Sequence, residues 1–335
     1  MQRFLVIQTA FTGDVVLATN IIEQLHTDFP QSKIDFLLRR GNESLFTGHP
    51  FLHEILIWDK KKNKYSNLFA LISHIKKNKY DKVINLQRYF STGLITVFSG
   101  AAETIGFDKN PLSFLFTKRI KHITGSNENP VHETERNFSL LQHFAGKRSS
   151  NIRLYPSAKN RGEVMPYTKG AYICVAPASV WFTKQYPKEK WVAFLKRIPQ
   201  HIHIYFIGGK EDKILCDEII TSLPEHHSKN FCGQLGFLSS AALMQHALMN
   251  YANDSAPVHI AGAVNAPITE IYCSTIPAFG YGPLSDNSFI VQTNEQLPCR
   301  PCGIHGKKEC PQKHFACAMG IQEKQLIATL DLPYE

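Results

Sequence analysis

Apolar and polar residues follow two alternating patterns along the chain. Short apolar runs of four to six residues, typical of buried strands, are followed by stretches in which apolar residues recur every three or four positions, as on one face of a helix. Strands that alternate with helices favour a parallel sheet covered on both faces. In the first 150 residues a helix opens near residue 13, and the pattern predicts strands at 4–7, 34–38, 55–58, 83–86 and 104–107 and helices at 66–75, 92–98 and 133–144.

The same alternation resumes in the second half of the chain. It predicts strands at residues 171–176, 203–207, 248–252 and 268–273, and helices at 187–194, 212–223, 239–248 and from 257 onward. Around residues 146–170 the pattern lapses into polar residues with Pro156 and Pro166, which indicates a linker. We therefore expect an α/β protein with doubly wound domains over 1–150 and 170–320, a linker at 151–169 and a C-terminal helix at 321–335.

The composition supports two globular domains. The chain has 335 residues, of which 43% are hydrophobic and 19% charged, so a disordered chain and a single small disulfide-bonded module are excluded. No apolar run approaches the roughly 18 residues that span a bilayer, and residues 4–7 are too few for a signal-peptide core. We expect a soluble cytoplasmic protein whose scattered cysteines are buried and reduced: Cys174, Cys216, Cys232 and Cys273.

Positive charge is concentrated in the first half of the chain. Residues 1–150 hold 20 Lys and Arg against 13 Asp and Glu, which accounts for +7 of the net +9. This half is predicted to face an anionic partner, such as nucleic acid, phosphorylated lipid or a membrane surface, with a solvated face as the alternative. Much of the excess comes from one cluster: Lys60, Lys61, Lys62, Lys64, Lys76, Lys77, Lys79 and Lys82.

The candidate sites lie in loops, because ligands bind beyond the carboxyl ends of strands in open parallel sheets. The first loop, at residues 9–14, ends in Thr12, Gly13 and Asp14 at the start of a helix, where an Asp is typical of a cap or a partner of the helix dipole. It matches neither the dinucleotide-binding motif nor the Walker loop, so nucleotide sites of those two types are excluded. The other loops follow three strand ends: Ala176, Ile207 and Ala252.

Two of these loops carry the parts of an anion site. The loop at residues 176–187 offers backbone N–H groups, the Ser179 hydroxyl and the Lys184 cation to a phosphate. Residues 253–259 (NDSAPVH) open a helix, and Asp or Ser before Pro at such a position is also a capping arrangement. Amides at this helix N-terminus, with His259 one turn in, suit a diphosphate or a sugar.

Residues 132–136 (HETER) share only their first two positions with the H-E-x-x-H zinc motif. Arg136 stands where the second histidine would be, and arginine is not a metal ligand, so a metalloprotease is excluded. A charged helix start is the structural interpretation of this segment. A substrate contact by His132, Glu133 or Arg136 is the functional one.

Four cysteines near the C-terminus are clustered as C-x2-C-x7-C-x6-C, and His305 and His314 lie between them: Cys299, Cys302, Cys310 and Cys317. This density is typical of a structural zinc site, although the second pair is not a C-x2-C, and four reduced cysteines in a C-terminal excursion at 299–317 are the alternative. A zinc-bearing nucleic-acid-binding protein is a second function class that the cluster and the basic charge allow. It lacks support from stacking residues, because Phe315 is the only aromatic residue in this part of the sequence.

Six motifs occur in order along nearly the whole chain, and together they resemble glycosyltransferase family 9, the ADP-heptose:lipopolysaccharide heptosyltransferases. The ordered set is far more specific than any one member. The motifs are T-x-x-x-G-D (Thr9 to Asp14), Y-D-x-x-I-N-L-Q (Tyr80 to Gln87), H-E-x-E-R-N (His132 to Asn137), the loop with Lys184 before Pro187 and Trp191, G-G-x-E-D (Gly208 to Asp212) and N-D-S-x-P-x-H (Asn253 to His259).

This resemblance implies a GT-B architecture, in which two Rossmann-like domains face each other across a cleft, with the acceptor on the N-terminal domain and the nucleotide-sugar donor on the C-terminal one. It implies Asp14 as the general base. The candidate acceptor contacts are Arg88, His132, Glu133 and Arg136. The resemblance also implies a donor site in which Ala256 stands where the family usually has Gly. The residues implied at the donor site are Ser179, Lys184, Glu211, Asp254, Ser255 and His259, and Ala256 and Pro257 belong to the same loop.

The implied reaction is an inverting transfer of heptose from ADP-heptose to a lipopolysaccharide-core acceptor. Asp14 would take the proton of the attacking hydroxyl, while Lys184 and the helix N-terminus at Pro257 stabilise the departing diphosphate, so catalysis requires no metal. The acceptor is anionic and the protein is expected at the inner face of the membrane, bound peripherally through residues 60–82, with no nucleic acid as partner. A same-fold transferase that uses another nucleotide sugar for surface-glycan synthesis is the alternative.

Overall fold

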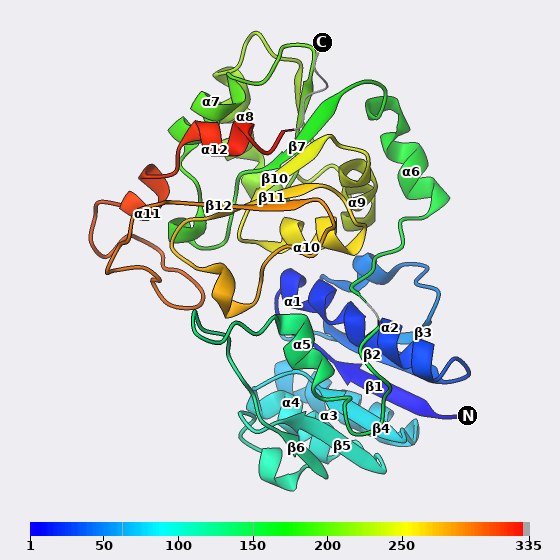
Figure 1. Cartoon of the computed structure of the whole chain (residues 1–335). Helices are drawn as coiled ribbons and strands as arrows, with labels where there is room; N and C mark the ends of the chain where they lie inside the picture. Colours follow the sequence, from blue (N-terminus) through cyan, green and yellow to red (C-terminus); the bar gives the residue numbers. More distant parts are fainter. Residues whose placement is uncertain (62, 150, 331–335) are drawn as a thin grey trace. The chain divides into compact units, whose positions relative to one another are not determined.

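The computed structural model describes residues 1–61, 63–149 and 151–330, which form two compact units. Unit 1 consists of Met1–Gly125 and Val131–Tyr155, and unit 2 consists of Ser126–Pro130 and the chain from Pro156 onward. Each unit contains a parallel sheet of six strands with helices packed on it (Figure 1). The predicted α/β class with two doubly wound sheets is confirmed.

The sheet of unit 1 has the strand order β3-β2-β1-β4-β5-β6, and all neighbouring strands are parallel. This is the doubly wound order, in which the chain changes direction across the sheet beside β1. Four of the five β1 residues are apolar and completely buried, as a central strand covered on both faces requires. The strands are β1 (Arg3–Ile7), β2 (Lys33–Arg39), β3 (Leu52–Trp58), β4 (Lys82–Asn85), β5 (Glu103–Phe107) and β6 (Lys118–Ile120).

One hydrophobic core of unit 1 lies between the sheet and its helices, where Leu5 and Ile7 of the central strand pack with Trp58, Ile75 and Ile95. The last two side chains come from the helices that follow β3 and β4. The α-helices of unit 1 are α1 (Thr12–Leu17), α2 (Thr19–Asp28), α3 (Lys64–Lys77), α4 (Phe90–Val97) and α5 (Glu133–Phe138), and its 3-10 helices are η1 (Glu43–Phe46) and η2 (Ser113–Leu115).

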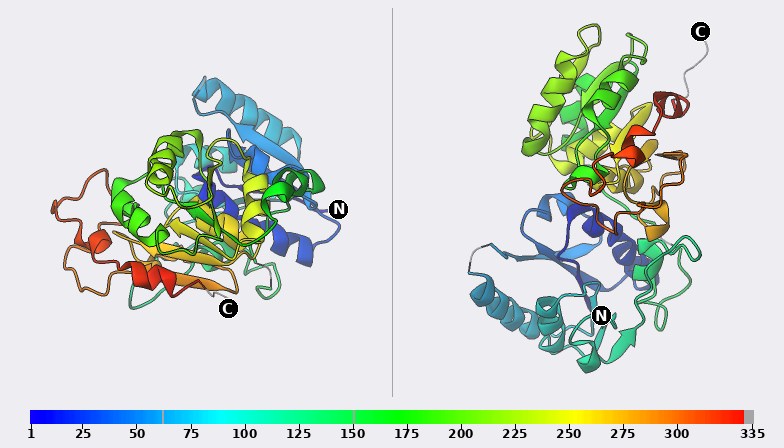
Figure 2. Two further views of the ribbon diagram at one scale, coloured as in Figure 1. Left: turned by 90° about the horizontal axis from the view of Figure 1, so that it is seen from above. Right: turned by 90° about the vertical axis from the view of Figure 1, so that its left-hand side faces the viewer.

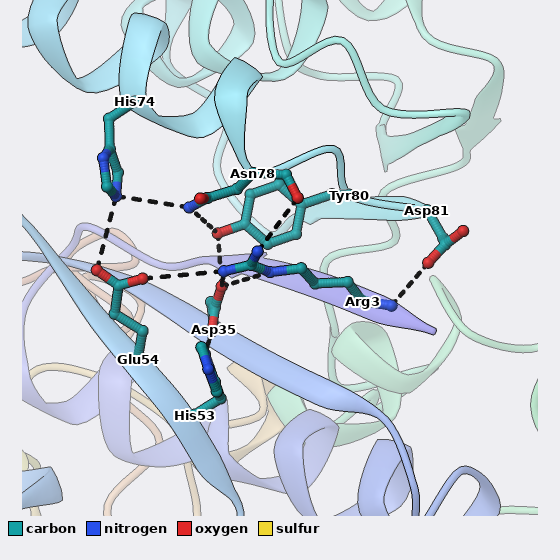
Figure 3. Close-up of polar contacts among 8 residues, drawn as sticks. All are labelled: Arg3, Asp35, His53, Glu54, His74, Asn78, Tyr80 and Asp81. Atoms are coloured by element: carbon teal, nitrogen blue, oxygen red, sulfur yellow. Dashed lines mark hydrogen bonds and ion pairs between the residues drawn. The ribbon is translucent and has the colours of Figure 1, made fainter. Parts of the chain in front are cut away.

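A buried polar cluster joins the amino ends of the strands in unit 1 (Figure 3). Asp35 on β2 is fully buried, and its Oδ2 accepts hydrogen bonds from Arg3 Nη2 at 3.0 Å and from the Tyr80 hydroxyl at 2.7 Å. Its Oδ1 lies 2.9 Å from Nδ1 of His53 on β3. The positive guanidinium balances the negative carboxylate, and the hydrogen bonds occupy the lone pairs of the carboxylate. Asp35 can therefore lie in the interior.

The sheet of unit 2 repeats the doubly wound order as β12-β11-β10-β7-β8-β9. All of its neighbouring pairs are parallel, and β7 and β10 lie side by side where the winding reverses. The strands are β7 (Tyr172–Ala176), β8 (His203–Phe206), β9 (Ser228–Asn230), β10 (Met249–Asn253), β11 (Ile268–Tyr272) and β12 (Ser288–Gln292).

The core of unit 2 is larger and rich in aromatic residues. Trp191 and Phe194 of one helix are fully buried, and Phe194 packs against Tyr251 of β10 with ring centroids 4.7 Å apart. The α-helices are α6 (Ala158–Val164), α7 (Lys188–Leu195), α8 (Lys213–Thr221), α9 (Phe237–Gln245), α10 (Ala256–Ala263), α11 (Ala316–Met319) and α12 (Glu323–Ile327); the 3-10 helices are η3 (Met165–Tyr167), η4 (Phe182–Lys184), η5 (Lys210–Asp212) and η6 (Pro277–Phe279).

The segment between β12 and α11 (orange in Figures 1 and 2) runs without helix or strand and contains Cys299, Cys302 and Cys310, whereas Cys317 lies in α11. It coincides with the excursion predicted at residues 299–317. None of the described helices is long and apolar enough to span a bilayer.

The structure departs from the predicted elements at places where the sequence pattern is weak. The helix predicted at 133–144 ends at Phe138 and continues as turns, with the Ser139 hydroxyl donating to Arg136 O. The predicted linker contains α6, and a capping box formed by Ser157 and Asn160 begins this helix. Within the helix predicted at 321–335, the described residues as far as 330 contain only α12 (Glu323–Ile327). Residues 331–335 lie outside the described residues. Three short strands were not predicted: β6, β9 and β12.

Candidate functional site

The doubly wound order singles out one position in each sheet. Ligands bind at the carboxyl edge where neighbouring strands send their connections to opposite faces, because the two loops diverge there and leave a crevice. In unit 1 this position is between β1 and β4, and in unit 2 it is between β7 and β10. The loops after these four strands contain most of the predicted site residues.

In unit 2, Asn253 fastens the loop that follows β7. It is completely buried at the end of β10, its Oδ1 accepts from the backbone N–H of Tyr186 at 2.9 Å, and its Nδ2 donates to Pro177 O at 2.7 Å. Within the loop, the Gln185 side chain donates to Ser179 O at 2.6 Å. The loop is therefore held at both ends, so the backbone position of Lys184 in η4 is fixed.

Lys184 and Asp254 come together as an ion pair between the two loops. Lys184 Nζ lies 2.7 Å from Asp254 Oδ2, with 14% and 8% of the two side chains exposed. The Thr275 hydroxyl donates to the same carboxylate oxygen at 2.5 Å. Because both groups are mostly withdrawn from water, their attraction is weakly screened, and an arriving anion would compete directly with Asp254 for the lysine.

The helix α10 begins directly after this pair. Ser255 occupies the position before the first turn, but its hydroxyl donates to Asn253 O at 3.1 Å instead of capping the helix amides, so the predicted cap is wrong for this side chain. Pro257 lies in the first turn, and Ala256 is the first helical residue. The first turn of a helix has N–H groups that lack intrahelical acceptors, so this end of α10 presents donors and a positive dipole end. His259 is buried one turn later.

The loop after β8 presents a second acidic group. Glu211 is exposed in η5, and Asp212 is half-buried with its Oδ2 accepting from the Gly209 N–H at 2.8 Å. Burial raises the pKa of Asp212. A Cβ on Gly209 would lie 2.7 Å from the carboxyl of Glu211, whose exposed side chain is free to take another rotamer.

Sequence reasoning missed Glu270, which lies in the middle of β11. The side chain is completely buried, with the Tyr272 hydroxyl and the charges of Asp254 and Lys184 near it. Burial raises the pKa of Glu270 well above its ordinary value, and the negative charge of nearby Asp254 raises it further, while Lys184 acts in the opposite direction. A single ionisable residue inside the apolar run at 268–272 was the signal in the sequence.

In unit 1, the loop after β1 leads into α1, and Asp14 lies in its first turn. Thr12 fixes the loop from one side, since its hydroxyl donates to Asn42 Oδ1 at 3.0 Å. Lys60 fixes it from another, donating from Nζ to Thr9 O at 2.9 Å and to the Thr9 hydroxyl at 3.0 Å. The predicted helix start at Gly13 and Asp14 is confirmed, within one residue.

The predicted acceptor residues divide into two groups. Arg88 is exposed just after β4, the strand beside β1. His132 caps α5: its ring Nδ1 accepts from the backbone N–H of Thr134 at 3.2 Å, and its backbone N–H donates to Glu135 Oε2 at 3.1 Å. Glu133 and Arg136 are buried and form an ion pair with each other. The charged helix start is confirmed; the acceptor roles stay predictions.

One set of three potential metal ligands gathers within 4.8 Å in the described part of the chain: Asp35, His53 and Glu54 (Figure 3). The Arg3 guanidinium already lies 3.0 Å from Asp35 and 4.0 Å from Glu54. It supplies the positive charge that a metal would bring, and the amino ends of the strands lie opposite the edge where ligands bind. We assign this cluster a structural role.

The clustered cysteines bring one ligand pair together. Cys299 Sγ lies 3.9 Å from His314 Nε2, near the roughly 3.6 Å that separates two ligands of a tetrahedral zinc ion. No third ligand atom among the described residues lies within 4.8 Å of both. Burial raises the pKa of Cys302 and brings that of Cys317 to about 11. The described residues therefore provide two zinc ligands instead of the four that a structural zinc site needs. The zinc site stays a prediction. The other four cysteines are buried thiols, as predicted.

Comparison with known proteins decides the family. The model of glycosyltransferase family 9 (heptosyltransferase) matches residues 68–314. This chain belongs to glycosyltransferase family 9. It is 27% identical over 308 residues to lipopolysaccharide heptosyltransferase 3 of Escherichia coli, an alignment that covers 87% of this chain and 89% of the relative.

Solved structures agree with the family 9 assignment at the level of the fold. The structure of E. coli ADP-heptose lipopolysaccharide heptosyltransferase II superposes with a TM-score of 0.80 at 18% identity, covering 99% of this chain and 98% of that one. An E. coli heptosyltransferase solved with ADP has a TM-score of 0.73 at 14% identity, with 98% of each chain covered. The chain thus has the GT-B fold of these family 9 enzymes.

Proposed function

We propose that this family 9 protein transfers heptose from ADP-heptose to a lipopolysaccharide-core acceptor with inversion, and that Asp14 is the general base. The observation that carries the proposal is the Lys184–Asp254 pair beside the N-terminus of α10, at the winding reversal of unit 2. This site combines a desolvated cation with helix N–H donors, the chemistry that binds a diphosphate. The matched relatives are lipopolysaccharide heptosyltransferases by name, and one matched structure contains ADP.

Donor binding would redistribute the charges around Lys184. The diphosphate competes with Asp254 for the ammonium group, and the α10 amides bind its other oxygens. As the bond to the anomeric carbon breaks, negative charge grows on the leaving diphosphate, and these fixed positive groups stabilise it most at that moment. Ser179, Ser255 and His259 lie on the same loops and helix and would contact the rest of the donor. Glu211 would contact the nucleoside.

On the acceptor side, Asp14 would remove the proton from the attacking hydroxyl. An ionised carboxylate is a weak base, so its effect depends on being positioned within hydrogen-bonding distance of that hydroxyl. The anchored loop around Thr12 and Gly13 supports this positioning. Because cationic groups of the chain stabilise the leaving group, we expect transfer without an added divalent metal.

The acceptor chemistry matches the charge of unit 1. A lipopolysaccharide core carries phosphates and acidic sugars, and the basic side chains Arg88 and Lys60 lie at or beyond the carboxyl edge of its sheet. The lipid part of such an acceptor resides in a membrane, so we place the protein peripherally at the inner face. Structural zinc at the clustered cysteines is a separate prediction that the transfer mechanism does not use.

Two measurements test this proposal. In thermal unfolding with ADP, UDP, GDP or CMP, selective stabilisation by ADP is expected, whereas selectivity for UDP or GDP would favour the same-fold transferase of another sugar. Asp14→Ala should reduce heptose transfer by at least about 1000-fold, since it removes the base and leaves the donor site intact. Its shift in unfolding temperature with ADP should equal that of the native protein. Full transfer activity in Asp14→Ala would overturn the assigned base.

A further inference from the structure

All of the net positive charge of the protein comes from one segment of unit 1. Residues 60–125 contain 13 Lys and Arg against three Asp and Glu, a net charge of +10, while the remainder of the chain carries 24 against 25. All three acidic residues have local partners: Glu103 pairs with Lys82 and His143, Asp81 accepts from the Arg3 backbone N–H, and Asp108 accepts from the His122 backbone N–H. The segment therefore presents a strongly basic surface to its surroundings.

The same segment also exposes an unusual number of large apolar side chains. Single exposed apolar residues are normal on proteins and need no partner, but a concentration of them marks an interaction site. Six of the nine exposed Phe and Tyr side chains found in the described residues occur within 50 positions of this segment: Tyr65 (69% exposed), Phe69 (66%), Tyr89 (59%), Phe90 (55%), Phe98 (57%) and Phe114 (69%).

These side chains come from elements that lie next to one another. Helices α3 and α4 pack against each other, and α3 also contacts β3 while α4 contacts β4 of the unit 1 sheet. Their C-terminal ends are close, since a Cβ at Gly100 would lie 3.2 Å from Lys76 Cγ. At the other end of α4, Asn110 donates to Tyr89 O at 3.0 Å and so ties the loop before η2 to the helix start. Thus α3 and α4 are neighbours, and η2 follows a loop that is tied to the start of α4.

Aromatic and basic side chains are interleaved on these elements. On α3, Tyr65 and Phe69 are one turn apart on the exposed side, and exposed Lys76 and Lys77 follow at its C-terminal end. Exposed Phe114 in η2 is followed within a few residues by exposed Lys118 and Arg119 on β6. This composition is typical of a membrane-binding surface, on which rings insert at the headgroup level and cations pair with anionic headgroups.

We propose that the face formed by α3, α4 and η2, which we call the aromatic–basic face, binds directly to an anionic lipid bilayer by inserting its exposed rings. The inference rests on the proposed function, because a lipid-linked acceptor must be reached at a membrane surface. It goes beyond electrostatic attraction of the lysines, since the rings add apolar burial that salt does not screen. Charge complementarity selects anionic lipid, and the exposed rings select a bilayer over a soluble polyanion.

The experiment measures co-sedimentation of the full chain with vesicles of phosphatidylethanolamine and phosphatidylglycerol, and with vesicles of phosphatidylcholine alone. The native protein should bind the anionic vesicles and bind the neutral ones at least tenfold more weakly. Phe69→Ser/Phe114→Ser should weaken binding to anionic vesicles by about tenfold or more at both 50 and 500 mM NaCl. The matched control is Phe289→Ser, an exposed ring on β12 of unit 2, which should bind as the native protein does.

A charge variant separates the two contributions. Lys76→Gln/Lys77→Gln should weaken binding about 30-fold at low salt, on the basis of roughly 1 kcal/mol for each basic residue near an anionic surface. At 500 mM NaCl its binding should approach that of the native protein, because salt already screens the charges. Equal vesicle binding by the native protein and Phe69→Ser/Phe114→Ser would overturn the proposal, and so would displacement of the protein from vesicles by RNA at low concentration.

A spectroscopic measurement guards against misfolded variants. With Phe69→Trp and Phe114→Trp, the fluorescence should shift to shorter wavelength on anionic vesicles beyond any change in the native protein, which contains three tryptophans. No such shift would overturn ring insertion. The membrane and transferase proposals fail separately: vesicle binding without any nucleotide effect on unfolding would contradict the transferase, and ADP stabilisation without vesicle binding would contradict the membrane face.

Discussion

Burial is the largest cause of the raised pKa of Glu270. An ionised carboxyl costs several kcal/mol in a completely buried position, so burial favours the protonated form of this group. Asp254, also mostly buried, differs because Lys184 and Thr275 contact it. The two carboxyls therefore differ in the groups that contact them.

A stability prediction follows for Glu270→Gln. The pKa of Glu270 is raised above its ordinary 4.5, so its stabilising contribution is fully present below about pH 4.5 and is lost as the pH rises through the raised value. Glutamine cannot ionise and avoids this loss. Relative to the native protein, the unfolding free energy of the variant should rise by about 1.4 kcal/mol for each pH unit above 4.5 until the raised pKa is reached.

Urea unfolding at pH 5 and pH 8 measures this difference. The exposed Glu225→Gln serves as the matched control and should give the same pH dependence as the native protein. Parallel pH dependences for Glu270→Gln and the native protein would show that Glu270 is ionised in the folded state.

At the scale of elements, the amino ends of four strands in unit 1 depend on one carboxylate. Asp35 connects β1 through Arg3, β3 through His53 and the start of β4 through Tyr80 (Figure 3). Hydrogen bonding to Asp35 together with burial raises the pKa of Tyr80, so the hydroxyl keeps its proton and continues to donate.

Tyr80→Phe removes that donor and leaves the rest of the ring in place. It should lower the unfolding free energy by about 1–2 kcal/mol, because a buried carboxylate loses one of its hydrogen bonds. Tyr89→Phe, in which the ring is 59% exposed, is the control and should change stability by less than about 0.5 kcal/mol. Unchanged denaturant midpoints for Tyr80→Phe would mean that Arg3 and His53 suffice to stabilise Asp35.

Most strands and long helices could be predicted because their residues are apolar at regular spacing, as in β1 and α3. The short strands could not. β6 and β9 have three residues each and are largely polar, so the neighbouring strand alone decides their conformation. In α5 the apolar spacing continues past Phe138, but the backbone changes to turns, which periodicity does not reveal.

At the scale of the whole molecule, the two units have separate sheets and separate cores. The core around Trp191 and the core around Trp58 share no residues. ADP is proposed to bind residues of unit 2, so at 100 times its dissociation constant it should stabilise that unit by about 2.7 kcal/mol. The unfolding free energy of unit 1 should change much less.

Hydrogen exchange followed by mass spectrometry can separate the two effects. ADP should slow exchange in the slowest amides of β7 and β10 and leave those of β2 and β5 nearly unchanged. UMP, as a control ligand, should produce neither change. Equal protection of both sheets by ADP would show that the two units unfold together.

The sequence by itself determined the α/β class, the two sheets, the ordered loop motifs and hence the resemblance to family 9, because these depend on local spacing and residue type. Only the tertiary structure decided which side chains meet. The Lys184–Asp254 pair joins residues 70 positions apart, and the Asp35 cluster joins three strands and a residue shortly before a fourth. The pKa of Glu270 is raised through burial by neighbours distant in sequence. Such contacts depend on the packing of parallel strands side by side, which local sequence does not encode.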